Sequence, residues 1–296
     1  MNEKDLLLGP VLSFRGIGKG KVWRVTALIG LKTGAESPRF EVDGKACAAP
    51  KELLSTRGER YLRYDISCKV LKDERTVSYG IPDGLIWNMT VPGNDFSPRM
   101  AYVSCNGFSD PAVMRKIIRT SDAVWEDLLY SHDRKLRRKP GEGEVKLLDK
   151  EQLWHEKRIH DKGLQRFHLM LMGGDQIYFD SIWEDIKLLR QWVTLPRKAQ
   201  LDFKVSKPLE REIEAFFFGL FNQRWLPIER PLWSSATAAL DAGAAMASMS
   251  TIMVWDDHDI FDGWGSYSCE MQNCELFQTL FRHARRAFWV FQLQNA

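Results

Sequence analysis

The stretch RFHLMLMGGD, residues 166–175, carries the clearest fold signal in the sequence. Its short apolar run is typical of a buried strand, and it ends in two glycines followed by an acid. Glycine allows a sharp backbone turn and a close approach by another group, so we expect Asp175 to leave the sheet with its carboxylate in a crevice. The alternative is that Asp175 caps the helix expected from the following segment, residues 180–192.

Two further apolar runs end in residues that can act as ligands. MAYVSCN, residues 100–106, ends in Ser104, Cys105 and Asn106, and TIMVWDDHD, residues 251–259, ends in acids and a histidine. The intervals between the three runs are long enough for helical crossovers, which predicts a largely parallel sheet in an α/β domain. Because sites in open α/β sheets form beyond the carboxyl ends of the strands, we expect these three strand ends to share one crevice.

The third strand end is unusually acidic. Its sequence, MVWDDHDIFDGWG at residues 253–265, has a tryptophan on each side of the charged residues. Unneutralised carboxylates this close together raise one another's pKa, and a bound cation is the usual remedy. At least one of the first three acids is expected instead to cap or orient the backbone. The charged residues are Asp256, Asp257, His258, Asp259 and Asp262.

His258 and Cys105 each allow more than one interpretation. His258 is predicted to be a metal ligand or a proton donor, because it lies among carboxylates at a strand end. Cys105 could be a small buried hydrophobic residue, but as a thiolate converging on Asp175 it would favour iron or zinc. A metal-independent hydrolase with Cys105 as nucleophile and His258 as base is a further alternative.

Helical patterns fill the intervals between the predicted strands. Residues 112–132, 234–249 and 275–294 have helical spacing or composition, and Leu209, Ile213 and Phe217 share one face of another helix. That helix has Ser206 as its expected cap and Pro208 in its first turn. A basic cluster within residues 134–139 is expected to be a solvated loop, with steering of an anionic substrate as the alternative.

The first part of the chain has a different pattern. Residues 21–31, 60–70 and 75–81 are rich in β-branched and aromatic residues and are separated by turn-forming clusters. We therefore expect a small β-sandwich domain over residues 1–95. The segment VPGNDFSPR, residues 91–99, is a predicted boundary, and residues 96–296 form the predicted second domain.

Composition limits the class of protein. The chain has 296 residues, 42 basic and 39 acidic, and a formal charge of +3, so charge gives no support for a nucleic-acid partner. No apolar run reaches the roughly 18 residues of a membrane helix, and the N-terminus has no signal peptide pattern, so no membrane partner is expected. The 5 cysteines are irregularly spaced, which is against a disulfide framework and favours the cytoplasm.

The motifs GGDQIYFD, WDDHDIFDGWGS and VSCN together resemble the PhoD-like (alkaline phosphatase D) family of metallophosphatases. The resemblance covers roughly residues 100–296. It implies a layered α/β metallophosphatase core preceded by a β-sandwich. It also implies hydrolysis of a small-molecule phosphate ester, a monoester or a diester, by a metal-activated water.

The resemblance also implies roles for individual residues. Cys105 matches the family's thiolate ligand to iron, and Asp175 matches a metal-bridging acid. Asp257 and Asp262 are competing candidates for a further metal ligand, Asp262 at the position of a calcium-binding Asn. His258 is expected to act near the substrate phosphate. The metals implied are iron and calcium, with zinc, manganese and magnesium as further candidates. Substrate-binding or supporting positions are expected at Asn106, Tyr178 and Asp256.

Two departures from the family pattern matter. Family members continue with further strands that carry Asp and His ligands, so this chain resembles the front part of a longer protein, with an incomplete core. We expect such a fragment to bind metal weakly and to catalyse little or nothing alone. Secreted members begin with an export signal that this chain lacks, which favours a cytoplasmic relative. The alternative is a non-catalytic interaction or structural protein that retains the fold.

Overall fold

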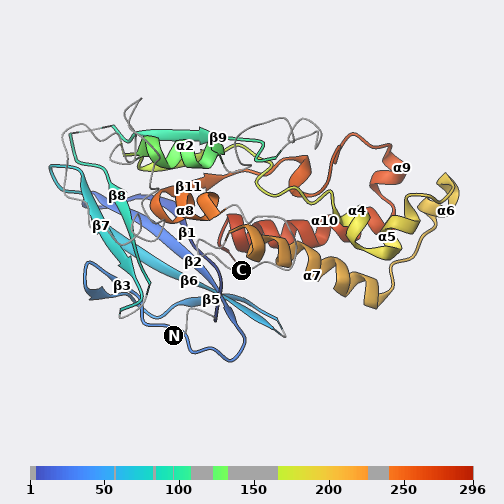
Figure 1. Cartoon of the computed structure of the whole chain (residues 1–296), viewed down its shortest axis with the longest axis horizontal. Coiled ribbons are helices and arrows are strands. Elements are labelled where there is room, and N and C mark those ends of the chain that lie inside the picture. Colours follow the sequence, from blue (N-terminus) through green and yellow to red (C-terminus); the bar gives the residue numbers. More distant parts are fainter. Residues whose placement is uncertain are drawn as a thin grey trace, which may run out of the picture. The chain divides into compact units, whose positions relative to one another are not determined.

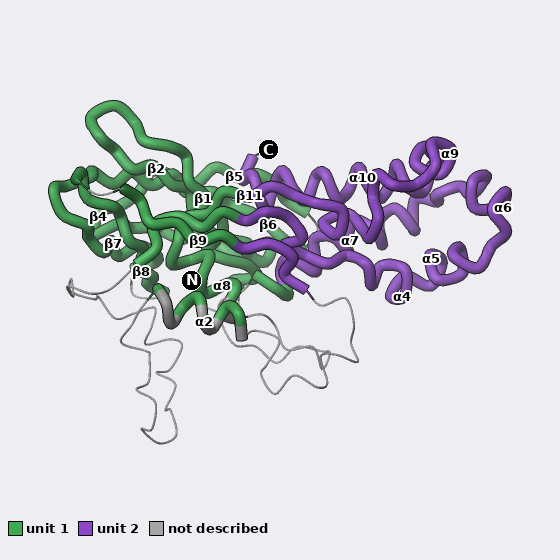
Figure 2. Tube along the Cα trace, turned by 90° about the horizontal axis from the view of Figure 1, so that it is seen from above, with its two compact units in different colours: residues 1–102, 111–171, 223–252 green, residues 103–110, 172–222, 253–296 purple. Residues whose placement is uncertain are grey.

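The computed structural model describes residues 5–56, 58–82, 85–95, 97–107, 123–132, 166–225 and 240–295. The chain divides into two compact units that alternate along the sequence (Figure 2). Unit 1 comprises residues 1–102, 111–171 and 223–252, and unit 2 comprises residues 103–110, 172–222 and 253–296. The division therefore falls at the last residue of each of three strands that end at Val103, Met172 and Met253.

The strands form a seven-stranded and a four-stranded sheet (Figure 1). The larger sheet has the order β5-β6-β2-β1-β11-β10-β9, and the smaller has the order β4-β3-β7-β8. The bounds in the larger sheet are β1 Leu6–Gly18, β2 Val22–Lys32, β5 Lys51–Ser55, β6 Glu59–Lys69, β9 Met100–Val103, β10 Leu169–Met172 and β11 Ser250–Met253. In the smaller sheet they are β3 Glu41–Val42, β4 Lys45–Ala46, β7 Arg75–Gly80 and β8 Ile86–Val91.

One hydrophobic core joins the two sheets of unit 1. Alternate residues of β2, such as Trp23 and Val25, are buried in the same cluster as Trp87 and Met89 of β8. This alternation is the pattern of strands with one face toward a core. Helix α8 (Leu240–Ser248) adds alanines to the cluster, and the Tyr79 hydroxyl donates to the Ala247 carbonyl at 2.6 Å. Helix α2 (Ala123–His132) belongs to the same unit.

The observed division differs from the predicted boundary near residue 95. Strand β1 pairs in parallel with β11, with Ser13 opposite Thr251, and the Thr251 hydroxyl donates to the Leu12 carbonyl at 2.7 Å. Strands of the predicted first domain are therefore continuous with strands of the predicted second domain. The sequence pattern identified the strands at 21–31, 60–70 and 75–81, but a strand pattern contains no signal for its partner from a distant segment.

The three strands that lead toward the predicted site run in the same direction. The His168 N–H donates to Arg99 at one end of β9 and β10, and the Gly173 N–H donates to Val103 at the other. The Ser250 hydroxyl likewise donates to the His168 carbonyl, and the Val254 N–H donates to Met172. The α/β class is confirmed, and β9, β10 and β11 are parallel as predicted, with β1 parallel to β11. The sheet as a whole is mixed and not largely parallel, because β1 with β2, β2 with β6, and β5 with β6 pair antiparallel.

A buried polar group fixes the starts of β9 and β10. His168 Nε2 lies 2.7 Å from the Glu74 carboxylate, Arg99 pairs with the same carboxylate, and the Arg99 N–H donates to His168 Nδ1 at 2.9 Å. Because Nδ1 accepts, Nε2 carries the proton of the neutral ring. Burial alone would raise the pKa of Glu74, but the hydrogen bonds of His168 and Arg99 and the Arg99 charge outweigh it and lower that pKa.

Unit 2 is mainly helical. Its helices are α4 Ile182–Asp185, α5 Lys187–Trp192, α6 Arg197–Leu201, α7 Lys207–Arg224 (whose last two residues fall in unit 1), α9 Cys269–Gln272 and α10 Glu275–Ala287, with the 3-10 helix η3 Asp257–Asp259 and the π-helix η4 Phe288–Gln292. The predicted cap of α7 is confirmed, since the Leu209 N–H donates to Ser206 Oγ. The predicted helix at 275–294 is α10 with η4, whereas the helices at 112–132 and 234–249 lie partly outside the described residues.

The sequence predicted neither a disulfide framework nor a membrane-spanning helix. All five cysteines are free, as expected. In the described ranges, no helix combines the length and the apolar character needed to cross a bilayer.

Candidate functional site

The ends of β9 and β10 meet in a strained pair of turns. Cys105 has a φ of 56° and Asp175 a φ of 54°, a left-handed conformation that costs non-glycine residues about 1 kcal/mol or more. The Cys105 N–H donates to the Gly174 carbonyl at 3.1 Å, and the Asn106 N–H donates to the Asp175 carbonyl at 3.0 Å. Such strain concentrates at functional sites, and here it falls on two of the predicted metal ligands.

Gly174 allows the acidic loop to approach β10. Its φ is 108°, and a Cβ atom at this position would lie 2.6 Å from the Cβ of Asp256. A side chain at residue 174 would therefore separate the turn after β10 from the acidic loop. The close approach predicted from the glycine pair is confirmed.

Three of the aspartates in the acidic loop accept backbone N–H groups, and the Asp257 carboxylate accepts that of Gly263 at 2.7 Å. Asp256 caps η3, and its carboxylate accepts the Asp257 N–H at 2.9 Å. The buried Asp259 carboxylate accepts the N–H groups of Gln176 at 3.0 Å and of Asp256 at 3.1 Å, which ties the turn after β10 to the turn after β11. Burial raises the pKa of Asp259 to about 6, although these hydrogen bonds act in the opposite direction. The prediction that at least one of Asp256, Asp257 and Asp259 caps or orients the backbone is confirmed.

The two tryptophans that flank the acids anchor the loop to α10. The Trp264 ring stacks on Phe281 with centroids 5.0 Å apart and an interplanar angle of 6°. The Trp255 ring stacks on Phe288 at 4.6 Å. Since both ends of the loop are fixed by aromatic packing, the acids between them are held in position against their mutual repulsion.

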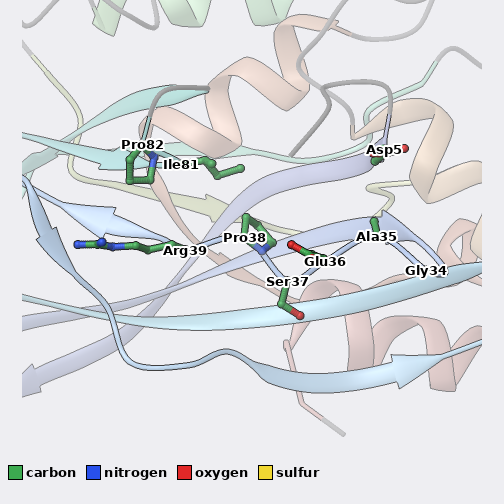
Figure 3. Close-up of a pocket in the computed structure, with 9 residues that line it drawn as sticks. All are labelled: Asp5, Gly34, Ala35, Glu36, Ser37, Pro38, Arg39, Ile81 and Pro82. Atoms are coloured by element: carbon green, nitrogen blue, oxygen red, sulfur yellow. The ribbon is translucent and has the colours of Figure 1, made fainter.

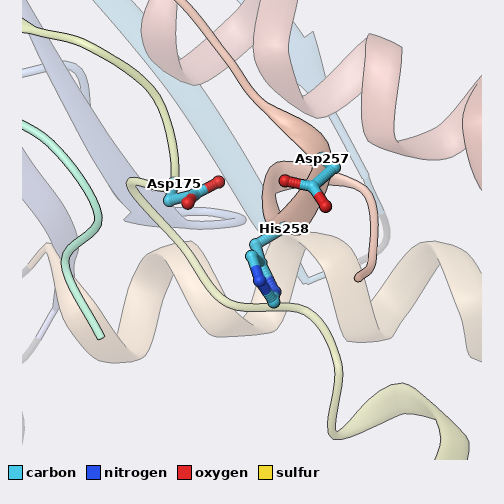
Figure 4. Close-up of side chains that lie close together, drawn as sticks. All are labelled: Asp175, Asp257 and His258. Carbon is cyan, nitrogen blue, oxygen red and sulfur yellow. The ribbon is translucent and has the colours of Figure 1, made fainter. Parts of the chain in front are cut away.

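Three side chains converge as a candidate metal centre. Asp175, Asp257 and His258 each offer a ligand atom, and these atoms lie within 4.8 Å of one another. Figure 4 shows the Asp175 and Asp257 carboxylates facing each other, with the His258 ring beside them. Asp175 is only 5% exposed, and its Oδ1 atom is buried with no hydrogen-bond partner in the described structure. A buried, unsatisfied carboxylate oxygen facing other ligand groups fits a cation site.

Electrostatics in the cluster support the same interpretation. Burial raises the pKa of Asp175, and the nearby charges of Asp257 and Asp256 raise it further, against a hydrogen bond from Cys105 and the charge of His258. A cation at this point would stabilise the ionised carboxylate. The donor set of two carboxylates and one imidazole suits a first-row transition metal. The Cys105 thiol, which is hydrogen-bonded to Asp175, lies beside this set.

Asp180 orients the His258 ring. Its Oδ2 lies 2.7 Å from His258 Nδ1, and its Oδ1 accepts the Asp262 N–H at 2.7 Å. Burial alone would lower the pKa of His258, but the hydrogen bond and charge of Asp180 outweigh it and raise that pKa. The Tyr178 ring packs against the imidazole with centroids 4.4 Å apart. A carboxylate on one ring nitrogen fixes the orientation of the other, as in many metal-bound histidines.

The remaining predicted residues occupy different positions. The Asp262 side chain is 79% exposed, 3.7 Å from His258 Nε2, and outside the three-ligand group. Cys105 is exposed beside Asp175, and Asn106 Nδ2 is 3.5 Å from the Gln176 carbonyl. The sequence interpretation gave Asp180 no role, although this second aspartate follows Asp175 by only five residues. The basic cluster at 134–139 lies outside the described residues.

A hollow on unit 1 has a different character (Figure 3). It encloses about 630 Å³, and the described residues give it acidic and basic groups but no histidine or cysteine. Its one arginine, Arg39, already pairs with Glu41 at 2.8 Å. The lining residues are Asp5, Gly34, Ala35, Glu36, Ser37, Pro38, Arg39, Ile81 and Pro82. The group at Asp175, Asp257 and His258 is therefore the stronger candidate for a reaction centre.

Comparison with known proteins agrees with the geometry. Residues 121–296 match the family described as PhoD related phosphatase. The chain belongs to the PhoD related phosphatase family. The matched region contains Asp175, Asp257 and His258 but begins after Cys105.

A curated relative extends the comparison. The chain is 26% identical over 249 residues to the uncharacterized protein YGR266W of Saccharomyces cerevisiae. The aligned region covers 82% of this chain but only 30% of the yeast protein. No solved structure matches the chain.

Proposed function

We propose that this chain supplies the metal-binding part of a PhoD-like hydrolase that cleaves small-molecule phosphate esters in the cytoplasm. The observation that supports this most strongly is the convergence of Asp175, Asp257 and His258, with a buried Asp175 oxygen that has no partner in the described structure. Metal ions held by such groups promote phosphate ester hydrolysis, because they bind both the phosphoryl oxygens and the attacking water.

Asp175 and Asp257 would hold the metal, with Cys105 as an additional soft ligand. Iron is favoured at the position nearest the thiol, and calcium, zinc, manganese or magnesium are candidates for a second position. When bound, such ions would lower the pKa of a water molecule and stabilise negative charge on the phosphoryl group. This assignment is consistent with the raised pKa of Asp175, whose ionised form a cation would favour.

His258 is the proposed proton donor to the leaving oxygen and not a metal ligand, because a protonated imidazole has no free nitrogen lone pair. The Asp180 carboxylate holds Nδ1 at 2.7 Å, so Nε2 is the nitrogen that remains to face a substrate. The raised pKa of His258 keeps the ring protonated to a higher pH, which suits a general acid. Tyr178 limits the movement of the ring, and Asn106 and Asp256 support the surrounding turns.

We further propose that β9, β10 and β11 are part of a metallophosphatase core with helices on its faces. In this arrangement the turns after all three strands contribute to one centre, as sites at the carboxyl ends of parallel strands do. The sandwich of residues 1–95 would then be an extension of this core and not an independent domain, consistent with the pairing of β1 and β11.

A non-catalytic role is the second candidate, and one observation favours it. Within the described ranges, only one group of three potential ligands occurs, whereas two-metal chemistry needs more. The chain also spans 30% of the length of the yeast relative. Turnover therefore has to be measured together with metal binding.

The test combines metal analysis with activity. The purified chain and its Asp175→Asn variant would be analysed for bound metal, and hydrolysis of an aryl phosphate monoester and diester would be measured with added ions. We expect metal in the wild-type chain and a strong loss in the variant. Metal content and turnover unchanged by Asp175→Asn would refute the site. Metal binding with no turnover would favour the non-catalytic role.

A further inference from the structure

Residues 186–201, called the α5–α6 turn, present exposed apolar side chains at one end of unit 2. Figures 1 and 2 both show α6 at the end of this unit. Leu188 is 42% exposed, Val193 47% and Leu195 37%, while their neighbours Leu189 and Trp192 are buried. Large apolar side chains exposed together on a short turn are candidates for an interaction surface.

The turn is rigid and therefore presents these side chains in a fixed arrangement. The Trp192 indole donates to the Gln200 carbonyl at 3.2 Å, and the Gln200 side-chain amide donates to the Trp192 carbonyl at 3.2 Å. The Leu195 N–H donates to the Trp192 carbonyl, and the Trp192 ring stacks on Trp183. A pre-ordered surface loses little conformational entropy on binding.

The same segment is strongly cationic. Residues 186–201 contain Lys187, Arg190, Arg197 and Lys198 and no acid, and the exposed acids Glu184, Asp185 and Asp202 lie just outside this range. None of the four forms an ion pair with a described residue, and Arg197 donates only to the neutral Ser268 hydroxyl. Other cations of unit 2 are paired: Arg282 with Glu210, Arg286 with Glu214, and Lys204 with Glu275. The charges on this turn are thus available to an external anionic surface.

We propose that the α5–α6 turn docks onto an anionic lipid bilayer. Lysine and arginine around exposed apolar side chains match a surface that is negatively charged at the headgroups and apolar beneath them. Leu188, Val193 and Leu195 enter the interface while the four cations contact the headgroups. This peripheral contact needs no membrane-spanning helix, and it departs from the sequence-based expectation that the protein has no membrane partner.

The first test is co-sedimentation of the full chain with vesicles. Phosphatidylcholine vesicles with and without phosphatidylserine would be compared at 0.1 M and 1 M NaCl, which shortens the screening length from about 10 Å to about 3 Å. We expect binding to the anionic vesicles that is lost at high salt, and little binding to neutral vesicles. Absence of binding to anionic vesicles would refute the proposal. Binding of this surface to a protein instead would not rescue it.

The second test assigns the binding to this turn. Each cation near an anionic bilayer contributes about fivefold, so Arg190→Gln with Lys198→Gln should weaken binding about 25-fold. The charge-matched control, Lys51→Gln with Lys69→Gln, alters exposed lysines of unit 1 and should have little effect. An equal loss in both variants would show general attraction of a cationic protein and overturn the assignment.

A third comparison tests the apolar part. Val193→Ser with Leu195→Ser should weaken binding at least tenfold, whereas Ile17→Ser with Leu71→Ser changes equally exposed side chains of unit 1 and should not. Circular dichroism and thermal unfolding would confirm that the variants are folded. Vesicle binding is independent of phosphatase activity, so failure of this proposal leaves the proposed function intact.

Discussion

Replacement of Gly174 by alanine tests whether the two loops of the site need to touch. A Cβ atom at residue 174 would lie 2.6 Å from Asp256 Cβ and 3.1 Å from the Asp256 nitrogen, both too close without movement of the acidic loop. Overpacking of this kind costs about 1–3 kcal/mol, and a φ of 108° adds about 1–2 kcal/mol for a residue with a side chain. We therefore expect Gly174→Ala to lower the free energy of unfolding by about 3 kcal/mol.

Urea unfolding, followed by tryptophan fluorescence, would measure this loss. The matched control is Gly219→Ala in α7, where a Cβ atom meets nothing within 4 Å and the helix should gain about 0.5–1 kcal/mol. When the metal-free protein is titrated with metal, Gly174→Ala should also bind it more weakly than the wild type. The substitution moves Asp256 and, with it, Asp257. If Gly174→Ala unfolds within about 0.5 kcal/mol of the wild type, the close approach of the two loops is not needed and our reasoning fails.

Three further perturbations have defined outcomes. Cys105→Gly should be more stable than Cys105→Ala by about 1 kcal/mol in chemical unfolding, because residue 105 has a left-handed backbone; equal stability would show that this strain is absent. In metal-free protein, Asp180→Asn should lower the pKa of His258, measured by NMR titration, since the Asp180 hydrogen bond and charge outweigh burial; an unchanged pKa would remove Asp180 from the site. The fold disfavours the ionised form of Asp259 and favours the protonated form. The protonated carboxyl therefore contributes fully to stability below about pH 3.8, and this contribution is lost as the pH rises through about 6. Between pH 4 and pH 7 the wild type should therefore lose about 2 kcal/mol of unfolding free energy relative to Asp259→Asn, and parallel curves for the two proteins would contradict this.

The strand ends of the site could be predicted from sequence because each combines an apolar run with a chemically specific ending. Gly174 and Asp175 illustrate this: a glycine before an acid predicted a close backbone approach, and the structure has it. The tryptophans on either side of the acids could be noticed but not explained, since their stacking partners on α10 and η4 lie more than fifteen residues away.

Other features depend on contacts that a single sequence does not encode. The parallel pairing of β1 with β11 joins residues 13 and 251, and nothing local in either segment indicates it. The choice between Asp257 and Asp262 was open for the same reason, because both follow β11 closely. Their side chains differ only through the turn that η3 makes, which directs Asp257 toward Asp175 and leaves Asp262 exposed.

Calorimetric titration of the metal-free chain with Mn²⁺ tests the central claim most directly. Asp175→Asn and Asp257→Asn should each weaken binding by roughly 10–100-fold or more, as loss of a ligand or its support does. Asp262→Asn, a matched acid in the same loop, should bind Mn²⁺ within about threefold of the wild type because its side chain lies outside the cluster. Wild-type affinity in Asp175→Asn, or a loss in Asp262→Asn as large as that in Asp257→Asn, would contradict the metal centre described here.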